Sequence, residues 1–302
     1  MDMTGLKKGR RGAIAKAIST VENDPKEARK LIKKIFAETG ESTIIGITGP
    51  AGAGKSSLIN KVLIHMKKLG ANPAVLAIDP TSHVTGGAIL GDRVRMSEST
   101  DSGAYIRSIA SRGATGAVSR SLRNSIRVLE YAGFDPVLIE SVGAGQTEVE
   151  ISKIADITVV VFNPNTGDSI QTIKAGLTEI GDIYVINKSD LAGADRLYSA
   201  VCDFIGDSEK KPAVLRTSAK KNTGISALAK MLVETSETRR NARPDEERLK
   251  AELGDIILSD MKEKIDKMME NDATVKECIK KMRSKKMDPF QAGEKIARSL
   301  VG

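Results

Sequence analysis

One eight-residue segment constrains the fold of this 302-residue chain more than any other feature. Residues 49–56 read GPAGAGKS, which has the spacing GxxxxGKS, and they lie between the apolar run TIIGIT and the helical pattern SSLINKVLIHMKKLG. Glycines allow backbone N–H groups to close around phosphate oxygens, and the positive end of the following helix favours the same anion. Residues 49–56, here called the phosphate loop, therefore predict a nucleotide-binding domain.

The chain after Gly40 fits a P-loop NTPase with an α/β fold. Short β-rich runs alternate with helical stretches, and several runs, such as ITVVVF and DIYVIN, are apolar at nearly every position. Strands covered on both faces by helices have this composition, so we expect a mostly parallel sheet flanked by helices. In such a sheet, ligands bind at the carboxyl ends of the strands. The expected strands are residues 43–48, 74–78, 105–109, 136–139, 157–162, 183–186 and 213–216.

Helical patterns precede and follow the expected strands. Near the start, two runs with apolar residues at helical spacing are separated by Asp24, an expected N-cap, and Pro25, an expected first helical residue. Near the end, an apolar stripe runs from Leu253 to Met269, and Asp288-Pro289 predicts the start of a last helix. The expected organisation is an N-terminal helical hairpin over 1–40, a P-loop domain over 41–236 and a C-terminal helical arm over 237–302.

The composition narrows the possible partners. The 47 Lys and Arg residues exceed the 39 Asp and Glu residues by 8, which permits an anionic partner, but the excess is spread thinly and fits a solvated surface. Aromatic residues make up only 3% of the chain, so the stacking platforms of single-stranded nucleic-acid binders are hard to build. We therefore expect no nucleic-acid partner.

The sequence favours neither a zinc site nor a membrane segment. Cys202 and Cys278 stand far apart, and His65 and His83 are the only histidines, which is a poor supply of zinc ligands. No stretch approaches the roughly 18 apolar residues of a membrane span, and the start MDMTGLKKGRRG lacks the apolar run of a secretory signal. We expect a cytoplasmic protein with reduced thiols and no membrane partner.

Each part of the phosphate loop has an expected role. Backbone N–H groups would bind phosphate oxygens, Lys55 would reach the β- and γ-phosphates, and Ser56 would ligate Mg²⁺. The expected nucleotide-binding residues of this segment are Gly49, Ala51, Gly52, Ala53, Gly54, Lys55, Ser56 and Ser57.

A second motif selects the base. The run DIYVIN leads into NKSD at residues 187–190, and a carboxylate at the fourth position can accept hydrogen bonds from N1–H and the 2-amino group of guanine. Adenine has an acceptor at N1 and no 2-amino group, so ATP would leave the Asp190 carboxylate without these donors. The motif therefore predicts GTP rather than ATP.

Four further residues complete the predicted base site. Asn187 and Lys188 would brace the base and the phosphate loop. Ser218 and Ala219 belong to TSAK, at the end of the next expected strand, and would bring backbone donors to the guanine O6. We therefore expect the chain to bind GTP and its product GDP.

Acidic residues at strand ends predict a Mg²⁺ site beside Ser56. Asp79 ends the second expected strand, and Asp92 lies in the glycine-rich segment that follows it. Either carboxylate suits Mg²⁺ or its bound waters, and an ordinary turn or cap residue is the alternative interpretation of each. Glu140 follows another buried strand, where most GTPases have Asp, and its longer side chain suits a water-mediated Mg²⁺ contact.

The residues after Glu140 are candidates for contacts with the γ-phosphate. Gly143 could donate its N–H, and the Gln146 amide could orient the attacking water, although a surface glutamine is an equally good interpretation. Hydrolysis depends mainly on orienting water and neutralising charge, so Lys55, Asp92 and Glu140 are expected to take part with them.

Taken together, these motifs resemble the MeaB/ArgK-like GTPases, a metallochaperone branch of the P-loop GTPases. The resemblance covers nearly the whole chain, and its most specific parts are DPTSHVTGGAILGDRVRM and ESVGAGQ. The chain has ESVGAGQTE where the family usually has ETVGVGQSE, and NKSD where NKAD is common. Further matching segments are RGAIAKAISTVENDPKEARKLI, GPAGAGKSSL and NPNTGDSIQTIKAG.

The resemblance implies more than the residues alone predict. It implies that residues 163–176 form a third switch segment with Asp168 and Lys174 as its active members, and that the C-terminal arm ties a homodimer together. It also implies a GTP-hydrolysing chaperone that protects an adenosylcobalamin-dependent acyl-CoA mutase, such as methylmalonyl-CoA mutase, and gates the loading of its cofactor. Nothing in the sequence names the client enzyme.

Two other activities remain alternatives. A kinase that uses ATP or GTP to phosphorylate an amino-acid transport protein would need an acceptor pocket and a base, and the sequence shows no extra acceptor domain. A nickel-delivery GTPase would need Cys and His ligands, which this chain supplies poorly.

Overall fold

The computed structural model describes residues 1–79, 103–110, 117–141, 151–165, 180–206, 211–239 and 246–301. The chain divides into two compact units, Met1–Arg248 and Leu249–Gly302, which are described in turn. Among the helices of these described ranges, none combines the length and the hydropathy of a membrane span.

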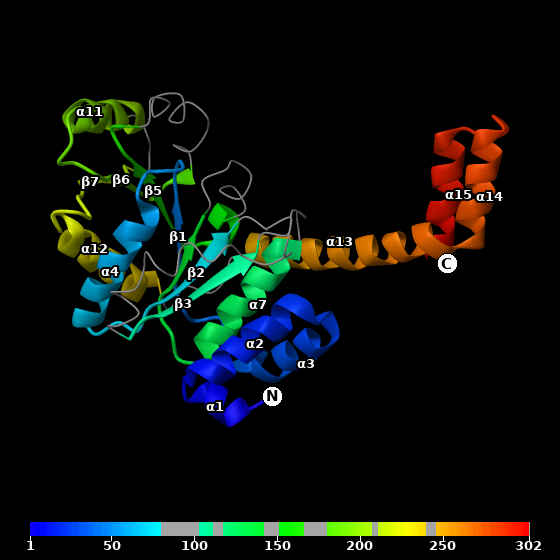
Figure 1. Cartoon of the computed structure of the whole chain (residues 1–302), viewed down its shortest axis with the longest axis horizontal. Coiled ribbons are helices and arrows are strands. Elements are labelled where there is room, and N and C mark those ends of the chain that lie inside the picture. Colours follow the sequence, from blue (N-terminus) through cyan, green and yellow to red (C-terminus); the bar gives the residue numbers. More distant parts are fainter. Residues whose placement is uncertain are drawn as a thin grey trace. The chain divides into compact units, whose positions relative to one another are not determined.

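Seven parallel strands form the sheet of the first unit, in the order β3-β2-β4-β1-β5-β6-β7 (Figure 1). Every neighbouring pair in this order runs parallel. The expected α/β fold is confirmed, and each strand begins and ends within one residue of its predicted bounds. The strands are β1 (Ile44–Thr48), β2 (Ala74–Asp79), β3 (Tyr105–Ala110), β4 (Val137–Glu140), β5 (Ile157–Phe162), β6 (Ile183–Ile186) and β7 (Ala213–Arg216).

Helices cover both faces of this sheet, which explains why its strands are so apolar. On β5, Val159 and Val161 pack in one core cluster with α4 (Lys55–Lys68) and α12 (Ile225–Arg239). Val160 and Phe162 alternate with them and pack with α11 (Ala194–Ile205) on the opposite face. The face that carries α11 is continued by α7 (Ala117–Tyr131) over β2 and β4.

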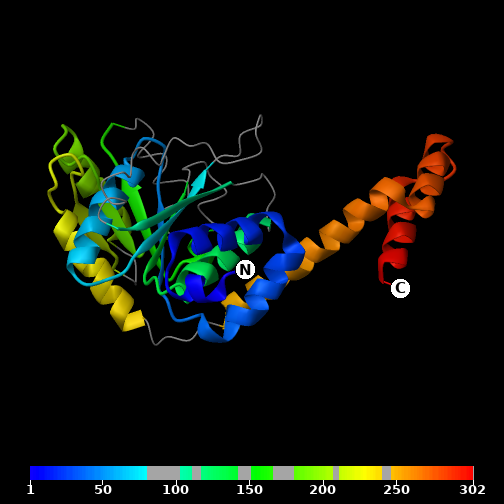
Figure 2. The ribbon, with the colours of Figure 1, turned by 60° about the horizontal axis from the view of Figure 1, so that its bottom comes forward.

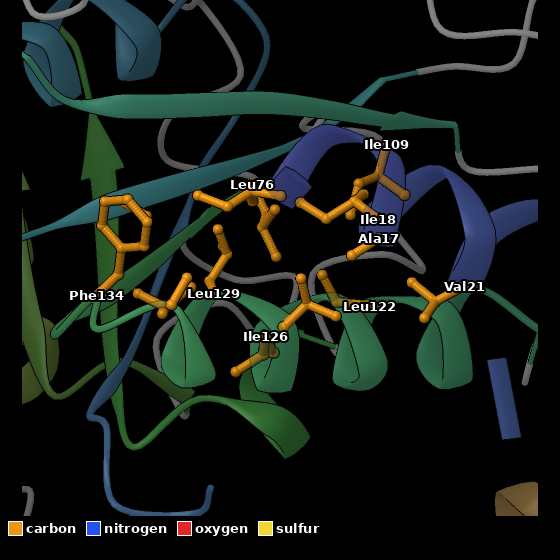
Figure 3. Packing of buried hydrophobic residues seen from close by; sticks show 14 of the residues in the cluster. Ala17, Ile18, Val21, Leu76, Ile109, Leu122, Ile126, Leu129 and Phe134 are labelled. Carbon is orange, nitrogen blue, oxygen red and sulfur yellow. The ribbon is translucent and has the colours of Figure 1, made fainter. Parts of the chain in front are cut away.

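The N-terminal helices pack on α7 within the same unit (Figures 1 and 2). In Figure 3, Ala17, Ile18 and Val21 of α2 face Leu122 and Ile126 of α7 across a buried layer. These helices are α1 (Met3–Lys7), α2 (Arg11–Asn23), α3 (Pro25–Ile35) and the short 3₁₀ helix η1 (Phe36–Glu38).

The predicted boundary between α2 and α3 is confirmed. Helix α3 begins at Pro25, and the Asp24 carboxylate accepts hydrogen bonds from the N–H groups of Lys26 and Glu27 at 3.1 and 3.0 Å. These bonds satisfy donors that have no partner inside the helix, so the Asp-Pro pair fixes where α3 starts.

Carboxylates bind the backbone at the amino ends of the strands. Asp156 accepts from the N–H of Ile44 at 2.7 Å, and Asp182 accepts from the N–H of Thr158 at 2.8 Å. Glu130 accepts from the N–H groups of residues 40, 41 and 42, which lead into β1. These contacts fix the amino ends of β1 and β5, so that their carboxyl ends enter the functional site in register.

The second unit, Leu249–Gly302, is helical. Val275 and Cys278 of α14 and Ala292 of α15 are buried, and α14 contacts α15. Phe290 and Gln291 donate their N–H groups to the Asp288 carboxylate at 2.8 and 3.0 Å, which confirms that Asp288-Pro289 starts the last helix. The helices are α13 (Glu246–Asn271), which begins before the unit boundary, α14 (Ala273–Arg283) and α15 (Pro289–Val301).

Candidate nucleotide-binding site

The phosphate loop connects the carboxyl end of β1 to the start of α4. Gly49 has φ of 137°, and a Cβ there would lie 2.1 Å from the Val161 carbonyl oxygen of β5. Gly54 has φ of 86°, and a Cβ there would lie 2.6 Å from Asn187 Nδ2. Any larger residue at either position would displace its neighbour, so both glycines are required for this close packing.

Lys55, the first residue of α4, extends back across the loop. Its Nζ donates to the carbonyls of Gly49 at 2.7 Å and Pro50 at 3.2 Å, and the residue is buried. The ammonium group therefore lies beside the turn that the phosphates of a nucleotide would occupy, with the α4 N-terminus contributing positive potential there.

Ser56 and Glu140 meet beside this loop. The Ser56 hydroxyl donates to Glu140 Oε1 at 2.7 Å, and Glu140, the last residue of β4, is only 5% exposed. A hydroxyl and a carboxylate are the hard oxygen donors that Mg²⁺ prefers, so this pair fits the predicted metal. Asp79 ends β2, which pairs with β4, so its backbone reaches the same edge of the sheet.

A pair of hydroxyl groups holds the end of β4 to β1. The Ser141 hydroxyl donates to Thr48 Oγ1 at 3.1 Å, and both residues are buried. The Ser141 N–H also donates to the Ile47 carbonyl at 3.0 Å. These bonds fix the end of β4, and hence the position of Glu140, against the start of the phosphate loop.

Asn187 links the phosphate loop to the base-binding segments. Its Nδ2 donates to the Ala53 carbonyl at 2.9 Å, and its Oδ1 accepts from Thr217 Oγ1 at 3.2 Å and from the Ala219 N–H at 3.3 Å. The side chain is 1% exposed, so these bonds form without competition from water. The NKSD and TSAK segments and the phosphate loop thus form one connected network.

Lys188 adds a second contact to the phosphate loop. Its Nζ donates to the Gly52 carbonyl at 2.8 Å, and its backbone has a positive φ of 55°. A left-handed conformation is costly for a residue with a side chain, and such strain is often retained at functional sites. This turn brings Lys188 to the loop and Asp190 among the residues that line the cavity described below.

Asp190 is held in its ionised form. A hydrogen bond from the Ser218 side chain lowers the pKa of the Asp190 carboxyl, and the nearby Lys221 and Lys220 charges act in the same direction. The carboxylate is therefore an acceptor over the whole neutral range, as recognition of guanine N1–H and the 2-amino group requires.

Ser218 differs in one respect from its expected role. Its N–H donates to the Thr223 carbonyl at 3.0 Å, and its hydroxyl accepts from the Lys221 N–H at 3.1 Å. The backbone donor predicted to reach guanine O6 is thus used to close the turn at residues 218–223. Ser218 contributes to the site through its side chain, and Ala219 keeps the N–H that faces Asn187.

The two base-binding segments and α4 enclose a cavity of about 580 Å³. Within the part of the chain that the structure describes, no aromatic side chain lines this cavity, which agrees with a site that recognises its ligand by hydrogen bonds and by the aliphatic parts of lysines. The lining residues are Gly54, Ser57, Asn60, Lys61, Asn187, Lys188, Asp190, Leu191, Ser218, Ala219 and Lys220.

Sequence reasoning missed several of these residues. Asn60 and Lys61 lie three and four positions after Ser57, so helical spacing alone places all three on one face of α4. Thr217 belongs to the TSAK segment, whose pattern predicts no role for this residue, although its hydroxyl holds Asn187. Asn163 follows β5 and contacts the phosphate loop, and no local pattern in the sequence predicts that contact.

Several predicted residues lie outside the described ranges. Asp92, Gly143, Gln146, Asp168 and Lys174 belong to this group, and for Asp79 only the backbone is described. Their roles at the metal, the γ-phosphate and the third switch stay predictions from the sequence.

Comparison with known proteins identifies relatives along most of the chain. Residues 14–273 match the family described as methylmalonyl Co-A mutase-associated GTPase MeaB. A candidate GTPase of Pyrococcus abyssi is 42% identical over 98% of this chain and 95% of its own length. GTPase ArgK of Escherichia coli is 35% identical over 73% of this chain and 70% of its own. The mitochondrial methylmalonic aciduria type A homolog of Mus musculus is 35% identical over 74% of this chain and 60% of its own.

Solved structures share the fold. The crystal structure of an LAO/AO transport system kinase aligns with a TM-score of 0.67 at 22% identity, covering 99% of this chain and 96% of the other. HypB from Helicobacter pylori, in complex with nickel, aligns with a TM-score of 0.53 at 13% identity over 72% of this chain and 97% of its own. At these identities the likeness concerns the fold alone.

Proposed function

The chain belongs to the MeaB family of methylmalonyl Co-A mutase-associated GTPases, and we propose that it is a metallochaperone that uses GTP hydrolysis to protect an adenosylcobalamin-dependent acyl-CoA mutase and to gate its cofactor loading. The observation that carries the nucleotide part is the Asn187 network, which joins the phosphate loop to the cavity containing Asp190. The partner is proposed from the family to which the chain belongs.

The base-binding part of the proposal rests on Asp190. Its carboxylate, kept ionised by the Ser218 hydrogen bond, would accept from N1–H and the 2-amino group of guanine. The Ala219 N–H would turn from Asn187 to the guanine O6 at little cost, because its present bond is long at 3.3 Å and therefore weak. Leu191 and the methylene groups of Lys188 and Lys220 would cover the faces of the base.

The phosphate-binding part rests on Lys55, Ser56 and Glu140. Lys55 would exchange the Gly49 and Pro50 carbonyls for β- and γ-phosphate oxygens, since charged acceptors bind an ammonium more strongly. Ser56 and Glu140 would hold Mg²⁺ directly or through water, and the metal when bound neutralises phosphate charge. Hydrolysis then requires an oriented water, for which Gln146 with the Gly143 N–H is the proposed site.

We propose a homodimer formed through the second unit. Leu253, Ile257 and Met269 of α13 are exposed by 58%, 60% and 54%, and Met261 and Ile265 continue the same row at four-residue intervals. A row of exposed apolar side chains along a charged helix is typical of a protein contact surface. A second copy of the chain is the occupant that the family resemblance suggests.

Turnover with a candidate client tests the chaperone proposal. We expect GTP hydrolysis to rise several-fold when an adenosylcobalamin-dependent acyl-CoA mutase from the same source is added, with a mutase from a different cofactor class as control. Transfer of the label from γ-³²P-GTP to water supports the GTPase, and transfer to an added transport protein would instead support the kinase. The absence of any stimulation by such mutases would contradict the chaperone role.

The location and remaining partners follow from the same proposal. A chaperone of a cytoplasmic mutase would itself work in the cytoplasm, and its site needs neither nucleic acid nor a membrane. Fractionation of cells that produce the native protein, with detection by antibody, tests this, and recovery with membranes would contradict it.

A further inference from the structure

We infer that Asn163 is a positioning residue for the phosphate loop, an inference that rests on the proposed nucleotide site. Asn163 directly follows β5, the strand beside β1 on the side opposite β4. Its side chain is 1% exposed, so a polar group here needs hydrogen-bond partners inside the protein.

Both ends of the Asn163 amide are engaged. Nδ2 donates to the Gly52 carbonyl at 3.2 Å, and Oδ1 accepts from the Asn165 N–H at 2.8 Å. A carbonyl can only accept and an N–H can only donate, so the two partners determine which way the amide faces. The second bond forms a local turn that holds the side chain toward the loop.

The Gly52 carbonyl has a second donor. Lys188 lies just after β6, and its Nζ donates to the same oxygen at 2.8 Å. A carbonyl oxygen has two lone pairs and can accept both bonds. The middle of the phosphate loop is therefore held by side chains from the ends of two strands, β5 and β6.

This arrangement determines where an amide donor of the loop faces. The peptide that joins Gly52 to Ala53 is planar, so its C=O and N–H groups face opposite ways. With the Gly52 carbonyl held by Asn163 and Lys188, the Ala53 N–H faces the other way and donates to the Pro50 carbonyl inside the loop at 3.2 Å. Asn163 thus holds the Ala53 N–H where an incoming phosphate oxygen can replace the Pro50 carbonyl as its acceptor.

Asn163 acts on the phosphates and not on the base. It is absent from the residues that line the cavity around Asp190, whereas Lys188 belongs to them. Loss of the Asn163 side chain should therefore weaken GTP and GDP by the same factor. The preference for guanine over hypoxanthine, measured with ITP, should stay unchanged.

Binding of a fluorescent GDP analogue to the full chain tests the inference. For Asn163→Ala we expect the Kd of the GDP analogue to rise about fivefold, which is the effect of losing one neutral hydrogen bond. Asn163→Asp keeps the size and the acceptor for Asn165, but places a carboxylate against the Gly52 carbonyl, so its loss should be larger. Asn165→Ala is the matched control, because the bond from Asn165 uses its backbone N–H and survives the substitution.

A double-mutant cycle with Lys188→Ala examines the shared acceptor. Either donor alone holds the Gly52 carbonyl only in part, so each single substitution weakens binding and the double variant should lose more affinity than the product of the two single losses. Losses that simply multiply would contradict a joint role at this carbonyl. Because the cycle cancels what Lys188 contributes to the base, it isolates the effect on the loop.

Lys55→Ala separates failure of this inference from failure of the site. If Lys55→Ala abolishes nucleotide binding while Asn163→Ala and Asn163→Asp leave Kd unchanged, the Asn163 inference is overturned and the site stands. If none of the three changes Kd, the proposed site is itself wrong. Thermal unfolding without nucleotide checks that each variant is folded. If Asn163→Ala does not fold, the near-isosteric Asn163→Asp variant is used to test the inference instead.

Discussion

Asn187 contributes to the site through both atoms of its amide, and at the residue scale this explains how two loops from separate strands are kept together. The side chain is buried and contacts Ala53, Thr217 and Ala219 through side-chain and backbone partners. A buried network of this kind is rigid when every member is satisfied, and loses more than one bond when a member is removed. The geometry of the base site therefore depends on the phosphate loop being in place.

Glu140→Gln tests the metal part of the site at the residue scale. The substitution keeps a carbonyl oxygen that can accept from Ser56 but removes the negative charge beside the proposed Mg²⁺. We expect the Mg²⁺ concentration for half-maximal GTP hydrolysis to rise about tenfold, as is usual when a partner of a metal site is altered. Asp203→Asn, which changes an exposed carboxylate on α11, is the matched control, and equal Mg²⁺ dependence in all three proteins would contradict the assignment.

At the element scale, short local signals determined most of the boundaries. Asp24-Pro25 and Asp288-Pro289 mark helix starts in the sequence, and the same carboxylates cap α3 and α15 in the structure. The apolar runs predicted the positions of the strands, because a strand that is covered by helices on both faces is apolar at nearly every position. These features depend on neighbours a few residues away, which is why the sequence alone was sufficient.

Long-range contacts between elements were not predictable in the same way. The Asn163–Gly52 bond joins residues 111 positions apart, and the Ile44–Asp156 bond joins residues 112 apart. Both depend on strands pairing in an order that differs from the order in the chain. The phosphate loop and NKSD were recognisable because each is contiguous, whereas the side-chain donors that hold the loop from outside come from two separate segments, at Asn163 and at residues 187–188.

The cap of α14 predicts a pH dependence at the element scale. Asp272 accepts from the Thr274 N–H at 2.6 Å, and this bond, with the Thr274 side chain, lowers the pKa of the carboxyl below its ordinary value of 3.8. The folded chain favours the ionised form, so the cap stabilises α14 above the ordinary pKa and is lost as the pH falls through the lower, folded-state pKa.

Thermal unfolding between neutral and strongly acidic pH measures this effect. We expect the wild type to lose stability on acidification more steeply than Asp272→Asn, because asparagine caps a helix well but does not titrate. Asp266→Asn, on the exposed surface of α13, is the control for the loss of one carboxylate. Identical pH profiles for the wild type and Asp272→Asn would contradict a titrating cap.

At the scale of the whole molecule, the net charge of +8 and the apolar row on α13 favour two different partners, an anionic nucleotide and a second protein chain. Part of the positive charge lies in Lys55 and Lys188 at the proposed triphosphate site. The row from Leu253 to Met269 presents apolar surface that a charged ligand would not cover, and a second copy of the chain would.

Ile257→Asp tests the proposed homodimer. A carboxylate buried in an apolar interface loses its hydration without gaining a partner, so the variant should be monomeric at concentrations where the wild type is dimeric. Ser259→Asp is the control, since it adds the same group about 160° around the helix from both Ile257 and Met261. Sedimentation equilibrium decides, and a monomeric wild type, or equal masses for the wild type and Ile257→Asp, would contradict the interface.

The central claim, that this is a guanine-reading GTPase site, is tested most directly by kcat/KM for GTP and xanthosine triphosphate in the wild type and Asp190→Asn. Xanthine has an oxygen where guanine has the 2-amino group, so the asparagine amide can donate where the Asp190 carboxylate accepts. The wild type should prefer GTP strongly, and Asp190→Asn should prefer xanthosine triphosphate, because each mismatch leaves a polar group unpaired. An equal loss for both nucleotides would show that Asp190 does not contact the base and would contradict the proposed site.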